Sequence, residues 1–213
     1  VARNFAEICR AQSTYNHSGE SIIAQRKLHS VFVSNDAGCG QLLIDSLSNS
    51  GIGRISTSDQ DHHDFAILIG HQVLPPSSYA HWLNSLTPHV AVIFDHDGVS
   101  VSPVIETGKT PCLTCFHEQQ VRLDQAWPEI ASQLLFSEQK FDDSTSRLFG
   151  AAIASQRALD CIDELEAHID VYRANRQRML DALPALGLRK IAPPDGAFYI
   201  YADVSDLTDD SLR

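Results

Sequence analysis

Long apolar runs are absent from this sequence. No stretch approaches the roughly 20 consecutive apolar residues that a membrane-spanning helix requires. The first residues, VARNFAEICRAQ, also lack the apolar core of a secretion signal, because polar and acidic side chains interrupt them. Low-complexity tracts and internal repeats are absent as well. We therefore expect a cytoplasmic protein with no membrane partner.

Basic residues are scarce relative to acidic ones. The chain has 16 lysines and arginines against 27 aspartates and glutamates, which gives a formal net charge of −11 at pH 7. Nucleic acid and anionic membranes are themselves negative, and such a surface would repel them. The composition therefore argues against both as main partners.

Cysteine is too sparse and too scattered to form a disulfide framework. The five cysteines are an odd number in a chain without a secretion signal. Only Cys112 and Cys115, in the run Thr110-Pro-Cys-Leu-Thr-Cys, are close enough to act together. Their thiolates suit zinc, but two further ligands would have to come from His117 or a partner subunit. The alternatives are a reduced pair of small apolar residues at a helix start, which we favour, and a redox pair, which the missing thioredoxin-like context disfavours.

Histidines offer a second candidate metal cluster. The chain has ten of them, and nothing in the sequence brings any group of them together. We therefore expect solvated loop histidines rather than a metal site at His62, His63, His71 and His117.

The first two thirds of the chain alternate between strand and helix patterns. Helical spacing of apolar residues at 41–48 and 77–86 predicts two helices, the first ended by Gly51 and the second begun by Pro75 and Pro76. Asp95-His-Asp-Gly98 predicts a hairpin turn. This order indicates an α/β fold, a Rossmann-like and mostly parallel sheet with an antiparallel edge. The predicted strands lie at residues 28–34, 54–57, 65–70, 89–94 and 98–105.

The last third is predicted to be mainly helical. One helix begins near Phe116 and has Trp127 and Pro128 near its middle. A long helix follows at 144–163, whose small residues would let it lie close to the sheet, and 164–183 continues it. Runs at 188–191 and 197–202 predict a small hairpin tail.

Residues 28–163 resemble the ThiF-type adenylyltransferase family, relatives of ubiquitin-activating enzymes. The glycines of a G-x-G-x-x-G loop after the first strand would fall at Asn35, Ala37 and Gly40. The resemblance also rests on Gly98-Val, Thr110-Pro-Cys-Leu-Thr-Cys and Gln125-Ala-Trp-Pro, in that order. In particular, the chain is similar to the actinobacterial branch that is linked to leader-peptide binding in thiazole/oxazole-modified peptide synthesis.

The resemblance implies ATP bound on the glycine loop, a carboxylate activated as its adenylate, a magnesium-binding Asp after the third strand, and zinc held by two Cys-x-x-Cys pairs. The positions that would bind the nucleotide are Asn35, Ala37, Gly38, Gly40 and, as a ribose-binding acid, Asp59.

This sequence departs from that pattern at each point. Asn35 and Ala37 replace glycines and would crowd the approach of the backbone to phosphate. His71 stands where the magnesium-binding acid would be, and a second Cys-x-x-Cys pair is missing. We therefore assign no catalytic residue and expect no adenylation.

Residues 160–213 resemble class I/II aminotransferases. The family's P-x-G-A-F-Y run matches Pro194, Gly196, Ala197, Phe198 and Tyr199. The resemblance implies a segment that passes from an interdomain helix into the small domain. The lysine that binds pyridoxal phosphate would lie upstream of it and the carboxylate-binding arginine downstream, and neither region is present. Pyridoxal phosphate is therefore expected only if the fragment belongs to a complete enzyme.

The two resemblances meet inside one predicted helix, near 158–161, and this indicates a chimeric or truncated product. We divide the chain into a degenerate ThiF-like domain, 1–163, and a partial aminotransferase small-domain segment, 164–213. The leading hypothesis is a non-catalytic domain that binds a peptide, with a cyclodehydratase-type enzyme as a possible partner and a homodimer as a possible assembly. The alternatives are a truncated aminotransferase and a divergent adenylyltransferase.

Overall fold

The computed structural model divides the chain into two compact units, Val1–Glu166 and Ala167–Arg213. The boundary lies inside one helix, α7 (Ser144–Ala182). The division predicted at 163/164 concerns ancestry, which compactness does not test, so it stays a prediction. The described residues are 5–15, 19–36, 38–137, 141, 143–192, 202–203 and 205.

A five-stranded sheet in the order β2-β1-β3-β4-β5 forms the centre of the first unit. The first four strands are parallel to their neighbours, and β5 pairs antiparallel with β4. This arrangement confirms the predicted fold class. The strand bounds are Ser30–Val33 for β1, Arg54–Ser56 for β2, Phe65–His71 for β3, His89–Asp95 for β4 and Gly98–Val101 for β5.

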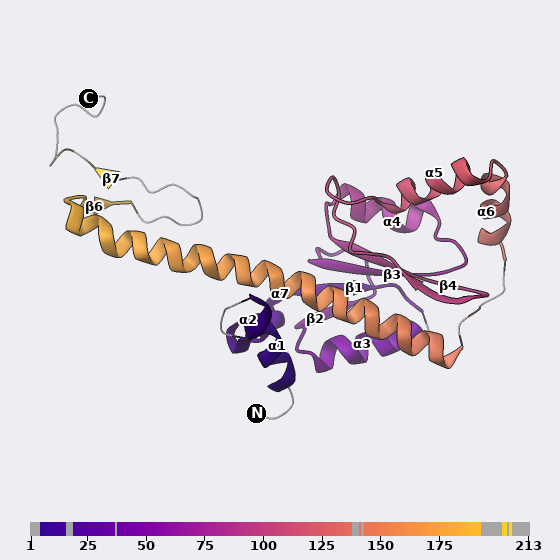
Figure 1. Ribbon diagram of the computed structural model, residues 1–213, viewed down its shortest axis with the longest axis horizontal. Helices are drawn as coiled ribbons and strands as arrows, with labels where there is room; N and C mark the ends of the chain where they lie inside the picture. Colours follow the sequence, from indigo (N-terminus) through magenta and orange to yellow (C-terminus); the bar gives the residue numbers. More distant parts are fainter. Residues whose placement is uncertain are drawn as a thin grey trace. The chain divides into compact units, whose positions relative to one another are not determined.

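Helices cover both faces of the sheet, which explains the apolar runs of β3 and β4. In Figure 1, α3 (Cys39–Asn49) and α7 lie on one side, and α4 (Pro76–Asn84) and α5 (Leu113–Leu123) lie on the other. On the α3 and α7 side, one core cluster includes Val33, Leu43, Ile67, Val92 and Ala154. On the α4 and α5 side, a second cluster includes Phe32, Leu68, Trp82, Ala91 and Leu113.

Small residues bring α7 close to the sheet, as predicted. Ala151, Ala154 and Ala158 are buried in the core. A Cβ atom added to Gly150 would lie 3.0 Å from Val92 Cγ1. A larger side chain at 150 would therefore push the helix off β4.

The chain between β5 and α5 differs from its prediction. The predicted strand 98–105 ends at Val101, because Pro103 has no N–H with which to continue a ladder. Ile105 then returns to the start of β4: its N–H donates to the His89 carbonyl at 2.7 Å, and its carbonyl accepts the His89 N–H at 3.1 Å. This crossing places α5 over the β4–β5 side of the sheet.

The predicted helix through Trp127 and Pro128 is wrong, because two helices occupy this region. Asp124, in an extended conformation, ends α5, and α6 (Trp127–Leu135) starts with Pro128 in its first turn. Proline fits that position, where its missing N–H would have no helical partner. The predicted end of α3 is confirmed, since Gly51 adopts a positive φ of 91°.

The described part of the second unit is small. It contains the last turns of α7, the short helix η2 (Leu183–Leu186), and β6 (Lys190–Ile191) paired antiparallel with β7 (Ala202–Asp203). Most of the predicted second tail strand, and all of the run from Pro194 to Tyr199, lie outside the described residues. None of the described helices is both long and apolar enough to cross a membrane.

A buried ion cluster holds the N-terminal helices α1 (Phe5–Tyr15) and α2 (Gly19–Gln25) to α7. Arg26, in the short helix η1 (Arg26–Leu28), is only 3% exposed. Its guanidinium donates to both carboxylate oxygens of Asp163, at 2.8 and 2.6 Å. It also donates to Glu7 Oε2 at 2.5 Å and to the Ser50 carbonyl at 3.0 Å. One cation therefore satisfies two acids and a carbonyl.

Replacing Arg26 with Met should lower the free energy of unfolding by about 3 to 5 kcal/mol, because Asp163 and Glu7 would stay behind without their cation. Urea unfolding followed by circular dichroism measures the loss. Arg54→Met is the matched control. The Arg54–Asp61 pair is half exposed at 3.7 Å, so its loss should cost less than about 1 kcal/mol. Adding Asp163→Leu to Arg26→Met should restore part of the stability, and equal losses in the two single variants would contradict this assignment.

Candidate functional site

The candidate site follows β1, at the carboxyl ends of the parallel strands. Ligands of open α/β sheets bind at this end, outside the strands. After Val33 the chain forms a loop and then enters α3 at Cys39. Asn35, Gly38 and Gly40 lie in this segment, and Ala37 lies outside the described residues. The loop thus has the position of a nucleotide loop.

The N–H groups at the start of α3 already have an anionic partner. Asp36 Oδ1 accepts from the Gly38 N–H at 3.0 Å and from the Cys39 N–H at 2.9 Å. Such N–H groups at a helix N-terminus are the ones that bind phosphate in nucleotide loops. Here a carboxylate of the same chain takes two of them.

His71 supports the same carboxylate from the end of β3. Its Nε2 lies 3.4 Å from Asp36 Oδ2, and its ring stacks on Phe94 with 5.6 Å between centroids. Burial raises the pKa of Asp36, but hydrogen bonds from Gly38, His71 and Cys39 outweigh it, so the pKa lies below its usual value. Asp36 is therefore ionised at neutral pH, and the residue that stands at the expected magnesium position pairs with it.

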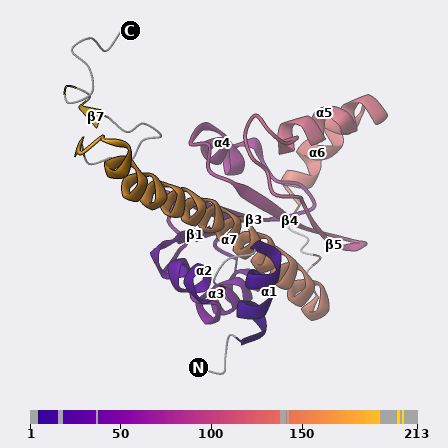
Figure 2. The same cartoon turned by 60° about the vertical axis from the view of Figure 1, so that its left-hand side comes forward.

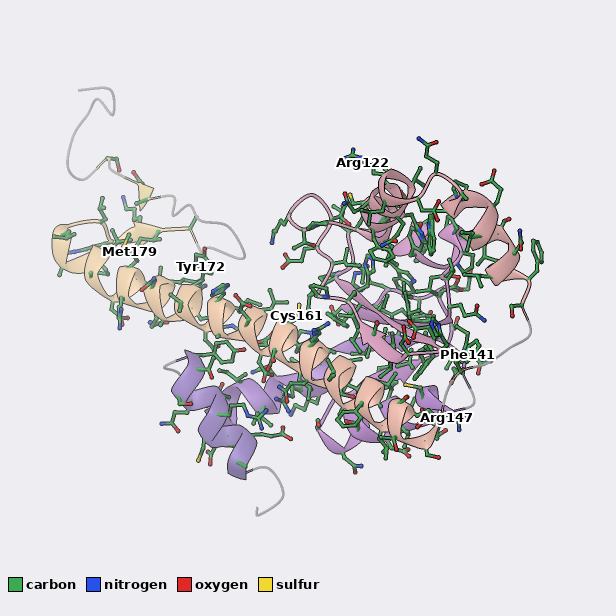
Figure 3. The ribbon with its side chains drawn as sticks, turned by 45° about the vertical axis from the view of Figure 1, so that its right-hand side comes forward. Arg122, Phe141, Arg147, Cys161, Tyr172 and Met179 are labelled. Carbon is green, nitrogen blue, oxygen red and sulfur yellow. The ribbon has the colours of Figure 1, made fainter. Side chains whose placement is uncertain are left out.

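Close packing restricts the loop further. A Cβ atom on Gly38 would lie 2.6 Å from Arg147 Nε, so the Arg147 side chain covers the loop backbone. Figure 3 shows Arg147 near the start of α7, beside α3. A Cβ atom on Gly40 would lie 3.1 Å from the Ser34 carbonyl oxygen. Both glycines thus serve contacts within the chain, which leaves their predicted role in nucleotide binding untested.

Asp59 lies away from this loop. His63 bridges the Ser58 carbonyl, 2.9 Å from its Nε2, and the Ser30 hydroxyl, 2.7 Å from its Nδ1. Ser30 begins β1, so Ser58 and its neighbour Asp59 are held near the amino end of that strand. The loop that contains Gly38 and Gly40 follows the carboxyl end of β1. The structure therefore does not bring Asp59 to Gly38 and Gly40.

Three of the four histidines, His63, His71 and His117, are not the solvated loop residues that the sequence suggested, and His71 lies at the end of β3. His63 is 2% exposed and packs beside Phe32. His117 Nδ1 accepts from Trp127 Nε1 at 3.3 Å, and the two rings stack with 6.2 Å between centroids. Burial is the main cause that holds the pKa of His117 below its ordinary value. His63 and His117 stabilise loops and helices.

Cys112 and Cys115 lie at the start of α5. Their sulfurs are 3.7 Å apart, close to the edge of about 3.8 Å that a tetrahedral zinc site with 2.3 Å Zn–S bonds would have. Two donors do not complete such a site, and His117 is engaged elsewhere. Within the described residues, the three-donor group that the structure assembles is Asp95, His96 and Asp97, in the exposed β4–β5 turn, far from this pair in sequence. The described residues thus supply two of the four donors, and zinc at Cys112 and Cys115 remains a prediction that requires further donors from a partner subunit.

A cavity of about 750 Å³ lies between α5 and the β4–β5 side of the sheet. We call it the α5 groove. Figure 2 shows β5 at the sheet edge beside β4. The lining is mainly apolar, with hydroxyl groups on the strand side and a charged end near Glu118 and Arg122, whose side chain Figure 3 labels on α5. The lining includes Ala91, Ile93, Ser100, Cys112, Cys115 and Phe116.

The sequence contained one signal for Asp36 that motif comparison missed. An Asp shortly before a glycine and a helix start is a common acceptor for the first helical N–H groups. Asp36 lies between positions 35 and 37, where the glycines of the motif are missing. Arg147 has no comparable signal, because it is more than a hundred residues from the loop that it covers.

Replacing Asp36 with Ala should lower the free energy of unfolding by about 1 to 2 kcal/mol at pH 7, since two N–H groups of α3 lose their acceptor. The folded-state pKa of Asp36 is depressed, so its contribution is fully present above the unfolded pKa of about 3.9 and disappears as the pH falls through the folded value. Urea unfolding at several pH values measures the difference from wild type. Asp59→Ala, at an exposed position, should change stability by less than about 0.5 kcal/mol. A difference that grew toward acid pH would contradict the assignment.

No protein-family model matches the chain. Several solved structures of Escherichia coli MccB are similar in fold. The structure with ATP has a TM-score of 0.55 at 13% identity and covers 77% of this chain and 64% of that chain. The structure with MccA has a TM-score of 0.55 at 13% identity, with coverage of 76% and 64%. A heterocyclase in complex with substrate and cofactor has a TM-score of 0.59 at 14% identity, covering 80% of this chain and 23% of that one. These likenesses confirm the ThiF-type fold.

A curated relative matches a short part of the chain. Valine–pyruvate aminotransferase of Mycobacterium tuberculosis is 51% identical over 49 residues, which are 23% of this chain and 13% of that protein. The matched length is close to that of the 160–213 segment, and the aminotransferase origin of that segment stays a prediction. The chain thus spans a small fraction of the relative's length, and less than two thirds of the MccB chains.

Proposed function

We propose that the first unit is a ThiF-type domain that binds a peptide in the α5 groove and does not adenylate it. In this proposal, the domain presents the peptide to a partner enzyme of the cyclodehydratase type. The resemblance to the leader-peptide-binding branch of the family supplies the class of ligand. The observation that carries the proposal is the α5 groove itself, a wide apolar recess beside an edge strand.

The size and lining of the groove suit apolar side chains of a peptide. Its volume of about 750 Å³ lies within the range of about 300 to 1,000 Å³ that is typical of ligand sites. Ala91 and Ile93 of β4 provide an apolar strand surface, and Phe116 of α5, 48% exposed, provides an aromatic contact. Exposed aromatic residues in such recesses tend to dominate binding energy.

Strand addition at β5 is a less suitable binding mode. Arg157 of α7 donates from Nη1 to the Val101 carbonyl at 2.6 Å and also to the Ser102 carbonyl. These bonds cover the end of the exposed backbone edge that an added strand would need. We therefore expect the peptide to bind through side chains in the groove.

The proposed loss of adenylation rests on Asp36. ATP phosphates would have to displace an ionised carboxylate from the Gly38 and Cys39 N–H groups and then lie close to it. The repulsion between two anions at such a site disfavours binding. His71, at the expected magnesium position, bonds to the same carboxylate.

Peptides selected from a random display library on the wild-type protein provide the test ligand. Replacing Phe116 with Asp should weaken their binding by about tenfold or more, which is about 1.4 kcal/mol, as measured by fluorescence anisotropy. Phe136→Asp is the matched control, because Phe136 is 87% exposed and lies outside the groove lining. Equal affinity of both variants, or a failure to select any peptide, would argue against the groove as the site.

The same peptides test for adenylation. Wild-type protein with ATP, magnesium and each selected peptide should give no ATP–pyrophosphate exchange above a protein-free control. Exchange that disappears with an active-loop substitution such as Gly38→Trp would restore the adenylyltransferase alternative. The homodimer remains a prediction.

A truncated aminotransferase is the second candidate, and the 49-residue match to the mycobacterial enzyme favours it. The function of the whole relative would require residues outside this fragment. Purified protein incubated with pyridoxal phosphate and desalted should be colourless, with no visible absorbance from a retained cofactor. Retention at one cofactor per chain, abolished by Lys190→Ala, would favour the aminotransferase.

A further inference from the structure

The thiol pair at the mouth of the α5 groove has features that zinc binding does not explain. Cys112 is the N-cap residue of α5, and Cys115 lies in the first turn of that helix. Their sulfurs are 3.7 Å apart, and both residues line the groove. Cys115 is exposed and Cys112 is half-buried, so reagents in solution can reach the pair.

Cys112 has the environment of a reactive thiolate. Cys112 is the N-cap residue of α5, so its sulfur lies at the end of the helix where the macrodipole favours negative charge. Thiols at helix N-termini and in Cys-x-x-Cys pairs are typically activated in this way. The sequence analysis placed the start of this helix near Phe116, three residues after its start at Leu113 in the structure.

The remaining cysteines lack one or more of these features. Cys39 is buried in the core, and burial raises the pKa of Cys161 to about 11. Cys9 is exposed on α1 but has no second cysteine within its helix. Cys9 is therefore a suitable control thiol.

Metal binding is the competing use of the pair. A structural zinc site needs four ligands, and among the described residues no third histidine, cysteine or acid forms a metal-binding group with the two thiols. The thiols are thus available for chemistry with each other.

We propose that Cys112 and Cys115 form a redox-active dithiol that exchanges with low-molecular-weight disulfides, such as glutathione disulfide, and closes to an intramolecular disulfide at the mouth of the α5 groove. The proposal does not depend on peptide binding, and peptide binding does not depend on it.

The exchange takes two steps. The Cys112 thiolate attacks one sulfur of glutathione disulfide; a bond forms from Cys112 to that sulfur, the glutathione S–S bond breaks, and one glutathione thiolate leaves. Cys115 then loses its proton and attacks Cys112 Sγ, which releases the second glutathione thiolate. The protein dithiol loses two electrons and two protons, and glutathione disulfide becomes two molecules of glutathione.

The geometry permits closure with a small movement. The sulfurs must approach from 3.7 Å to the disulfide length of about 2.05 Å. Leu113, between the cysteines, is 5% exposed and anchors the first turn of α5 against the second core cluster. The movement can therefore be confined to the side chains of Cys112 and Cys115.

The test uses the full chain, equilibrated in glutathione buffers of increasing oxidised fraction, quenched in acid, alkylated and mapped by mass spectrometry. We expect the peptide that contains 112–115 to lose two hydrogens, and to regain them with dithiothreitol. Cys9→Ser should behave like wild type. Cys115→Ser should trap a glutathione adduct on Cys112, whereas Cys112→Ser should give at least tenfold less adduct on Cys115, because Cys112 is the attacking thiol.

Two results would overturn the proposal. In the first, Cys112 and Cys115 stay reduced in fully oxidised glutathione. This result overturns the proposal whether elemental analysis finds one zinc per chain or none. In the second, the wild-type protein forms only glutathione adducts without closure. Circular dichroism of each variant distinguishes loss of folding from loss of exchange. In the wild-type protein, without any substitution, iodoacetamide should alkylate Cys112 faster than Cys9.

Discussion

A helix that follows a buried parallel strand begins with N–H groups that have no partner in the helix, and they must be satisfied. In this chain, Asp36 satisfies two of them from inside the loop. The contact holds the loop between β1 and α3, brings His71 from β3 onto the same carboxylate, and lies under the Arg147 side chain of α7. Three elements that would surround a nucleotide in the ThiF-type fold are thus bound to one another.

The α5 groove has a different origin, in the path of the chain after β5. The antiparallel hairpin ends at Val101, and the chain crosses back to pair with His89 before α5 begins. Leu113 fills the core beside Ala91, but the surface over Ile93 and Ser100 remains open. The lining of the α5 groove therefore contains no described residue of the loop between β1 and α3. The thiol pair lies on this open side.

The sequence predicted the sheet well because both the strand pattern and the turn signals are local. Buried runs such as Phe65–His71 have no competing helical period, and Asp-Gly at 97–98 marks the hairpin. The errors concern interruptions and distant partners. The break between α5 and α6 would have been predicted only if Pro128 had been placed in the first turn of a helix and not in its middle. The burial of His63 and the Arg26–Asp163 pair, 137 residues apart, depend on tertiary contacts that no local pattern encodes.

The sequence predicted where the candidate site lies in the fold, but not which groups occupy it. Strand and loop patterns located the segment that contains Asn35 and Gly40, but not the acceptor that occupies it. The resemblance concerns the missing glycines, whereas the structure shows that the carboxylate between them accepts from two N–H groups of the loop. A substitution at 35 or 37 alone would leave that carboxylate in place. The Arg147 side chain also lies close to the backbone of Gly38.

The long helix α7 runs across the boundary between the two compact units. Helical hydrogen bonds join residues four apart, so a helix continues across a junction without any tertiary contact. Along α7, buried positions recur at Ala154, Ala158 and Ile162 and end with Glu166, which lies 3.1 Å from His29, and Ala167. Beyond them, side chains such as Tyr172 and Met179 are exposed, at 57% and 50%. The core packing of α7 therefore stops close to where the aminotransferase resemblance starts.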